Sequence, residues 1–364
     1  MSRLHLVNLG VHNGGDLLMA MAAGLRLRRG GPLVVDGRWT AHVDKLRIAH
    51  GQRNWLDRLK RKVAAARASG LSAGSPLFRS GDLVLDINGF RHGERWPEKN
   101  LTDDLERAYA VGRAGAHYVL MPKSYGPFNG RTGPMMRELI ALADLAYARD
   151  RLSIDHCLAF GAVPRFSPDY TIDIQPPAGV SMPEQDRRSV VYIPNSKLVE
   201  RGLFEDFESY AVYIRDCVRA VQRRGFDVTV LFHQGKDLGA LKIPLQRYGL
   251  NCEFHANPLK TKGVLRQSAF VVSSRYHGMI GALTQDVPCL VIGWSYKYAG
   301  FIEYCPAAQP LLINDVSTDS FVSKLDWLLE DGRMPALRED LATSNQTLAQ
   351  RSAAMWADIA RLSE

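Results

Sequence analysis

The chain has 364 residues, of which 46% are hydrophobic and 23% charged, a composition that is ordinary for globular proteins and excludes a disordered or collagen-like chain. A formal net charge of +8 favours an anionic partner, which could be a phosphorylated small molecule, a membrane surface or nucleic acid. Five widely spaced cysteines without a C-x-x-C pair exclude a disulfide scaffold and a zinc site of the usual spacing, and they indicate a reducing compartment.

The N-terminal half alternates short strands with helices. An apolar strand at residues 4–9 leads into a glycine-rich loop at residues 10–15, and an apolar helix follows from Asp16. Further apolar strands are predicted at residues 33–35, 83–87, 118–121 and 145–148. Short buried-type strands between helices predict a largely parallel sheet with helices on both faces. The polar residues near the N-terminus do not fit a signal peptide, and no apolar run is long enough to span a membrane, so we expect a cytoplasmic protein.

The C-terminal half repeats this rhythm after a proline-rich stretch at residues 164–188, which is typical of a linker. Strands are predicted at residues 190–193, 228–232, 270–273 and 289–292, and helices at residues 204–224, 238–248, 259–267 and 276–284. A long amphipathic helix is predicted at residues 341–362.

These segments predict an α/β protein of two Rossmann-like domains that face each other across a cleft. We place an N-terminal domain at residues 1–170, a linker at 171–188, a C-terminal domain at 189–340, and a C-terminal helix at 341–364 that could pack back on the first domain. Ligands of open α/β sheets bind beyond the carboxyl ends of the strands, so we expect the chemistry in the strand-to-helix loops.

One such loop, residues 273–278 with the sequence SSRYHG, is the most informative segment of the chain. A helix N-terminus offers free N–H groups to an anion, and Arg275 adds a planar fork for a carboxylate or phosphate. His277 can exchange a proton near neutral pH, and Gly278 lets a ligand approach the backbone. Lys297 follows the next strand, which is expected to be a neighbour in the sheet. A lone arginine or histidine is more often solvated or structural, and it is the combination that indicates a site.

The run from residue 270 to residue 301 resembles the signature of the polysaccharide pyruvyl transferase family, with its S-x-R-x-H junction, small-residue helix, V-P strand and aromatic-x-K loop. Other family landmarks follow in the right order, and the resemblance spans roughly residues 5–305. These landmarks are Asn13-Gly14-Gly15-Asp16, Ser124-Tyr125-Gly126-Pro127-Phe128, Ala148-Arg149-Asp150 with Ser153, and Pro168-Asp169. Lys123 stands where the family usually has glutamine, a departure that concerns the acceptor side more than the donor side.

The resemblance implies a transferase that moves the enolpyruvyl group of phosphoenolpyruvate onto a hydroxyl pair of a polysaccharide or lipid-linked saccharide, forming a pyruvate ketal and releasing phosphate. It implies that Arg149, Arg275, His277 and Lys297 surround the donor, with Gly278 beside it. His277 could protonate the donor or stabilise its phosphate. No cofactor and no metal are expected, because the donor has enough cationic partners and the site lacks the carboxylates that Mg²⁺ prefers.

On the acceptor side, the loop of Asn13, Gly14 and Gly15 leaves room for a sugar. Asp16 is the leading candidate for the general base that activates a hydroxyl, although aspartate is also a favoured helix N-cap. Asp86, at the end of its strand, is a second candidate on this side. His233, after the strand at 228–232, either lines the cleft or is a structural histidine.

Residues 45–67 are rich in lysine and arginine, with apolar residues at near-helical spacing. This pattern is typical of a helix that lies on an anionic membrane surface, and equally of a solvated helix that packs on its own domain. The first interpretation would place the enzyme at the inner face of the membrane, where a lipid-linked acceptor is found.

Two other classes remain open at the level of sequence. A nucleotide-sugar glycosyltransferase of the GT-B type would share the twin α/β architecture, but such enzymes often place a carboxylate against the donor ribose, whereas residues 273–278 offer arginine and histidine. A nucleic-acid-binding protein would explain the charge and nothing else. The chain has no recognition-helix motif, no aromatic sheet signature and no basic tail, so no nucleic-acid partner is expected.

Overall fold

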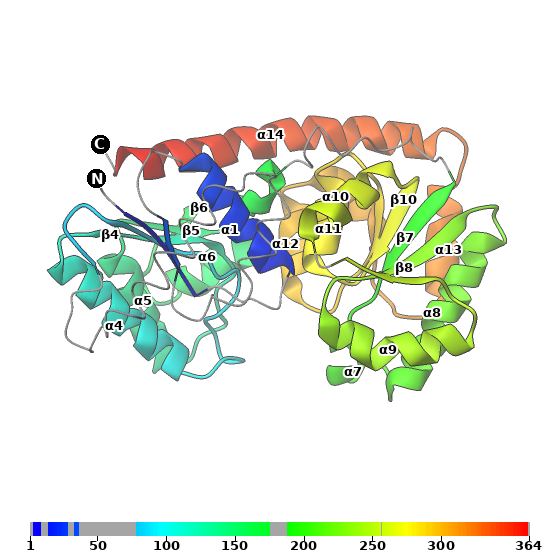
Figure 1. The fold of residues 1–364 in the computed structure, drawn as a ribbon, viewed down its shortest axis with the longest axis horizontal. Helices are drawn as coiled ribbons and strands as arrows, with labels where there is room; N and C mark the ends of the chain where they lie inside the picture. The colour runs from blue at the N-terminus through cyan, green and yellow to red at the C-terminus, as the bar shows by residue number, and fades with distance from the viewer. Residues whose placement is uncertain are drawn as a thin grey trace. The chain divides into compact units, whose positions relative to one another are not determined.

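The structure, a computed structural model, describes residues 3–8, 14–27, 33–35, 78–174, 188–255 and 257–362, and it divides into two compact α/β units (Figure 1). The first unit ends at Ile174 and also takes in the end of the chain from Gln350, and the second unit ends at Ala349. Asn13, the basic stretch at 45–67 and residues 175–187 of the predicted linker lie outside the described residues.

Within the described residues, the first unit is built on a six-stranded parallel sheet of order β2-β1-β3-β4-β5-β6. Strand β3 is buried throughout, which requires helices on both faces of the sheet. The helices α4 and α5 pack together, with Leu105 and Met136 in the same hydrophobic core as Val84 of the sheet. The elements are β1 (Leu4–Val7), α1 (Gly14–Arg26), β2 (Leu33–Val35), β3 (Leu83–Asp86), α4 (Lys99–Arg113), β4 (His117–Lys123), α5 (Thr132–Leu142), β5 (Leu145–Ala148), α6 (Arg151–Leu158), β6 (Arg165–Phe166) and the 3₁₀ helix η1 (Tyr170–Asp173).

The second unit has a six-stranded parallel sheet of order β12-β11-β10-β7-β8-β9 in the residues that the structure describes. Helices α9 and α13 each pack against α8, and α10 packs with α11 (Figure 1). The elements are β7 (Ser189–Ile193), α7 (Lys197–Glu200), α8 (Phe207–Gln222), β8 (Asp227–Phe232), α9 (Gly235–Arg247), β9 (Cys252–Phe254), α10 (Pro258–Gln267), β10 (Phe270–Ser273), α11 (Tyr276–Leu283), β11 (Cys289–Ile292), α12 (Tyr296–Glu303), η2 (Pro306–Leu311), β12 (Leu312–Ile313) and α13 (Thr318–Leu328).

The predicted α/β architecture is confirmed, and the differences lie at the edges of the sheets. The short strands β6, β9 and β12 were not predicted, because two or three residues at a sheet edge carry too little apolar pattern to be recognised. Residues 171–174, the start of the predicted linker, belong to the first unit and include most of η1.

The C-terminal helix α14 (Arg333–Arg361) begins eight residues earlier than predicted and has residues in both units. Asn345 donates to the carbonyl of Leu283 at 2.8 Å in the second unit. In the first unit, Trp356 Nε1 and Ser352 Oγ donate to the carboxylate of Asp173 at 2.8 Å and 2.6 Å. The end of the helix therefore packs on the first unit, as the sequence suggested. None of the helices in the described ranges is both long and apolar enough to cross a membrane.

Candidate active site

The order of strands in the second sheet reverses between β7 and β10, since β8 and β9 extend it on one side and β11 and β12 on the other. Ligands of doubly wound sheets bind at such a reversal, beyond the carboxyl ends of the strands. Ile193 pairs with Ser273 in the parallel register, so the residues that follow, Asn195 and Arg275, leave the sheet at the same level. The segment 273–278 thus opens at the expected place for a ligand.

A buried hydrogen-bond network fixes the backbone just before Arg275. The carbonyl of Ser274 accepts from Asn195 Nδ2 at 2.8 Å and from the Tyr298 hydroxyl at 2.6 Å. The Tyr210 hydroxyl contacts Ser274 Oγ at 3.2 Å and accepts from the backbone N–H of Asn195 at 3.1 Å. These hydrogen bonds connect the end of β7, α8 and α12 to Ser274. Together they fix the position of the next residue, Arg275.

Arg275 forms an ion pair with Asp237, a fully buried carboxylate in the first turn of α9. The second oxygen of Asp237 accepts from the backbone N–H of Ser196 at 3.0 Å, which holds the carboxylate in place. Arg275 Nε is buried without a hydrogen-bond partner among the described residues, so the guanidinium keeps a donor for a ligand. Asp237 was not predicted from the sequence, and the available signal was an acid in the loop-to-helix segment that follows the strand at 228–232.

Helix α11 begins directly after Arg275, and its first residues carry His277 and Gly278. Ser273 Oγ accepts from the backbone N–H of Arg275 at 3.1 Å and stabilises this turn. A Cβ atom on Gly278 would lie 2.5 Å from Ser273 Oγ and 2.8 Å from Ile193 Cδ1. The glycine therefore lets α11 pack closely on the strands, a reason that the sequence interpretation had not considered.

Lys297 lies among aromatic rings at the start of α12. Its Nζ atom is 4.6 Å from the ring centroid of Trp294 and 5.4 Å from that of Tyr276. The Tyr276 ring meets the His277 ring edge-on, with centroids 5.4 Å apart. Contacts with the faces of aromatic rings hold a lysine ammonium in place without cancelling its charge. The structure thus brings Arg275, His277 and Lys297 together at one edge of the second sheet.

His233 follows β8 and lies close enough to this cluster for its charges to act on it. Burial lowers the pKa of His233 to about 3, with further contributions from the charges of Arg275, His277 and His255. His233 Nε2 has no hydrogen-bond partner in the part of the chain that the structure describes. The imidazole is therefore neutral at physiological pH.

Because His233 is neutral in the folded protein, the free energy of unfolding depends on pH. The direction of this dependence follows from the pKa values of His233 in the folded and unfolded chain. The unfolded chain binds a proton at His233 below about pH 6.5, whereas the folded chain does so only near pH 3. The free energy of unfolding should therefore fall as the pH drops below 6.5, by up to about 1.4 kcal/mol per pH unit from this residue. Urea unfolding of the wild type and of His233→Gln at several pH values will measure it. Equal slopes for the two proteins would show that His233 is not held neutral.

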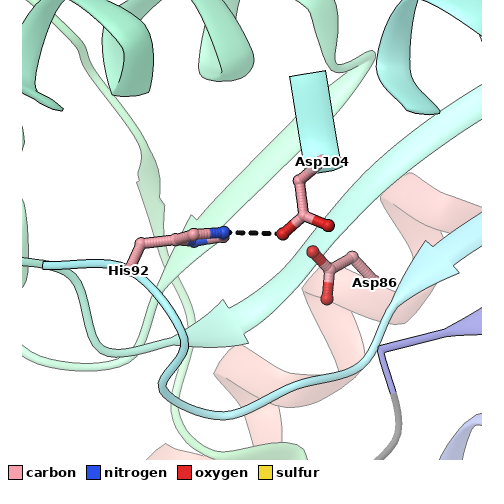
Figure 2. Close-up of side chains that lie close together, drawn as sticks. All are labelled: Asp86, His92 and Asp104. Carbon is pink, nitrogen blue, oxygen red and sulfur yellow. Dashed lines mark hydrogen bonds and ion pairs between the residues drawn. The ribbon is translucent and has the colours of Figure 1, made fainter. Parts of the chain in front are cut away.

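The first sheet has its own reversal between β1 and β3, and a buried polar cluster lies there (Figure 2). Asp86, the last residue of β3, forms an ion pair of 2.8 Å with Lys123, and both side chains are fully buried. Burial lowers the pKa of Lys123, and the charge of Asp86 opposes this shift. Asp86 thus has a buried counter-ion, a partner that the sequence interpretation of Asp86 as an acceptor-side residue did not include.

Asp104, in α4, accepts from His92 Nε2 at 2.7 Å and from Arg91 Nε at 3.1 Å. Burial opposes ionisation, but the His92 hydrogen bond and the charges of Arg91 and Arg107 hold the pKa of Asp104 well below its usual range. In Figure 2 the carboxylate of Asp86 points toward that of Asp104, and possible ligand atoms of Asp86, His92 and Asp104 lie within 4.8 Å of one another.

A metal ion does not suit this cluster. Two carboxylates already meet three cationic side chains, those of Lys123, Arg91 and Arg107. Hard cations such as Mg²⁺ bind where carboxylate and carbonyl oxygens are in excess. We therefore assign the cluster a structural role in holding the loops beyond β1, β3 and β4.

Arg149 belongs to the first unit and is almost completely buried. It pairs with Asp169 at 2.7 Å and donates to Ser124 Oγ at 3.0 Å. Ser124 Oγ in turn donates to Asp150 at 2.8 Å. A Cβ on Gly89 would lie 2.9 Å from Arg149 Nη1, so this glycine allows the chain to pass against the guanidinium. Three of the sequence landmarks, 124–128, 148–153 and 168–169, meet in this one network.

The glycine-rich loop is described only from Gly14 onward. Helix α1 begins at Gly14, so Gly15 and Asp16 are its second and third residues. Asp16 is therefore not the N-cap, and that alternative is wrong.

Two doubly wound parallel sheets, one with a cationic cluster where its strand order reverses, define a two-unit α/β protein of the GT-B-like class. The sequence model of the polysaccharide pyruvyl transferases matches residues 13–296, and the chain belongs to that family. This confirms the resemblance found in the sequence and identifies the protein as a transferase.

Solved structures share the fold at low sequence identity. The UDP-GlcNAc 2-epimerase from Neisseria meningitidis, bound to UDP-GlcNAc, superimposes with a TM-score of 0.59 at 13% identity over 98% of each chain. MnaA of S. aureus in its UDP co-structure has a TM-score of 0.56 at 10% identity over 94% of this chain and 91% of that chain. The spinosyn rhamnosyltransferase SpnG with spinosyn aglycone gives 0.53 at 13% identity over 98% and 99%. No curated protein matches the sequence.

Proposed function

We propose that this protein transfers the pyruvyl group of phosphoenolpyruvate to two hydroxyl groups of a saccharide, forming a cyclic ketal and releasing phosphate. The observation that carries the proposal is the cluster of Arg275, His277 and Lys297 at the strand reversal of the second sheet. Membership of the family supports a saccharide acceptor.

The charge of the donor suits this cluster. Phosphoenolpyruvate carries about three negative charges near neutral pH, from a carboxylate and a phosphate whose second pKa is about 6. The Arg275 fork can bind the carboxylate or phosphate bidentately, and the N–H groups at the start of α11 can bind a phosphate oxygen. Arg149 is assigned to the donor by family resemblance, and we retain it in the proposal.

The reaction requires one proton at the CH₂ carbon of the donor and one at the departing phosphate. Protonation of this carbon makes C2 electrophilic, the first sugar hydroxyl attacks C2, and the C2–O bond to phosphate breaks. The second hydroxyl then attacks C2 and closes the ketal. The two hydroxyl protons balance those taken up by the methyl group and the phosphate. His277 either delivers the first proton or stabilises the phosphate oxygens, and Asp16 is the candidate base for the hydroxyl.

On the acceptor side, the loop of Asn13, Gly14 and Gly15 is the proposed sugar site. Asp86, which pairs with Lys123 at the end of β3, is the second acceptor-side candidate. A lipid-linked saccharide would suit the basic stretch at 45–67, which could bring the enzyme to an anionic membrane surface. Neither a metal nor a cofactor takes part in the proposed reaction.

Ligand-dependent thermal stability tests the donor. Phosphoenolpyruvate at one hundred times its dissociation constant should stabilise the protein by about 2.7 kcal/mol, while UDP and GDP at the same concentration should not. Phosphate release with a panel of saccharides, followed with product mass, then identifies the acceptor, and EDTA should leave the rate unchanged. Stabilisation by a nucleoside diphosphate instead would favour a glycosyltransferase and contradict the proposal.

A further inference from the structure

We propose that His233 is a ligand of the bound donor anion and takes up a proton when that anion binds. The inference rests on the proposed function for the identity of the donor. It rests on the second unit alone for the site.

The strand register places His233 and Arg275 on the two sides of Asn195. Tyr192 of β7 pairs with Val230 of β8, and Ile193 of β7 pairs with Ser273 of β10. Counting on from these pairs, His233 and Arg275 leave the sheet at the same level, on either side of Asn195. Neighbouring strands lie about 4.8 Å apart, so the backbones at His233 and Arg275, with Asn195 between them, are roughly 9.6 Å apart. An anion bound beyond Asn195 can bridge the two side chains across this span.

The fixed positive charge of the cluster is too small to neutralise the bound donor anion. Arg275 and Lys297 bring two positive charges, and the buried carboxylate of Asp237 brings one negative charge against Arg275. These fixed charges sum to one positive charge, whereas the donor carries about three negative charges. A neutral imidazole such as that of His233 can supply more positive charge by binding a proton.

The surroundings of His233 allow its protonation state to change. Its Nε2 atom is buried and makes no hydrogen bond within the described residues. Burial disfavours its protonation most, and the titratable groups Arg275, His277 and His255 disfavour it further. Asp237 faces the cluster through Arg275. An anion in contact with His233 would reverse the balance, because an opposite charge at short range favours the protonated ring.

The test is calorimetric titration of the full chain with phosphoenolpyruvate at about pH 7, in buffers that differ in ionisation enthalpy. The dependence of the observed heat on the buffer gives the number of protons taken up. His233→Gln should take up about one proton fewer than the wild type and bind the donor about tenfold more weakly, as expected for one lost charge-assisted hydrogen bond. His233→Asn provides a second variant if the first fails to fold.

Sulfate serves as a second probe, because it does not titrate near neutral pH and any proton uptake then belongs to the protein. His117→Gln, at the start of β4 in the first unit, is the matched control and should behave as the wild type. Equal proton uptake by the wild type and His233→Gln would overturn the inference. Uptake with sulfate but no binding of phosphoenolpyruvate would uphold it and overturn the proposed function, and failure to bind either anion would overturn both.

Discussion

Replacing His277 with alanine should slow phosphate release from phosphoenolpyruvate by at least about 10²-fold. His277 lies at the start of α11, two residues beyond the arginine that pairs with Asp237, and its ring contacts the Tyr276 ring that also faces Lys297. In either of its proposed roles, the residue stabilises charge that develops during the reaction. Steady-state release of phosphate with a productive acceptor measures the effect.

His277→Gln separates the two roles. Glutamine can donate a hydrogen bond to phosphate but cannot deliver a proton, so substantial rescue would assign His277 to phosphate stabilisation. A glutamine variant as slow as the alanine variant would assign it to proton transfer. The unfolding midpoints of both variants should match the wild type. An alanine variant that retains the wild-type rate would remove His277 from the mechanism.

Replacing Lys123 with alanine should lower the free energy of unfolding by about 3–5 kcal/mol, because Asp86 would remain buried without its counter-ion. The two charged groups are 2.8 Å apart and completely shielded from solvent. Solvent therefore cannot compensate the carboxylate that is left behind. Urea unfolding followed by circular dichroism measures the loss.

Replacing both partners provides the control for this prediction. Asp86→Leu combined with Lys123→Met removes both charges, and most of the lost stability should return. Lys99→Ala breaks an exposed pair with Asp103 one helical turn away and should change stability by only about 0.5 kcal/mol. If the double variant is as unstable as Lys123→Ala, packing rather than charge explains the effect.

The fold could be predicted from the sequence because its central strands are apolar and regularly spaced. The buried strands at 83–86, 270–273 and 289–292 were found almost to the residue. The order of the strands was not predicted. It depends on which strand pairs with β7 and which with β1, and this is decided by packing across the sheet rather than by local pattern.

The candidate site was predictable only where its residues are adjacent in the chain. Arg275 and His277 lie in one junction, and Lys297 follows the next strand. Asn195 follows β7, and Asp237 lies in the first turn of α9 after β8. They reach Arg275 and its neighbouring peptide only because the sheet places β10 beside β7. Lys123 was noticed as a departure from the family pattern, but its burial against Asp86 could not be read from the sequence.

Helix α14 limits which fragments of the chain can fold on their own. A fragment that stops after Ile174 would keep the ion pair of Asp173 with Arg26 but would lose Ser352 and Trp356, the two hydrogen-bond donors that α14 gives to this acid. A fragment that begins at the second sheet and ends at the C-terminus would carry the last turns of α14. The apolar residues of these turns would no longer pack against the first unit. Neither half of the gene therefore encodes an autonomous unit, and the last turns of the helix have to be supplied in trans or joined to the N-terminal part.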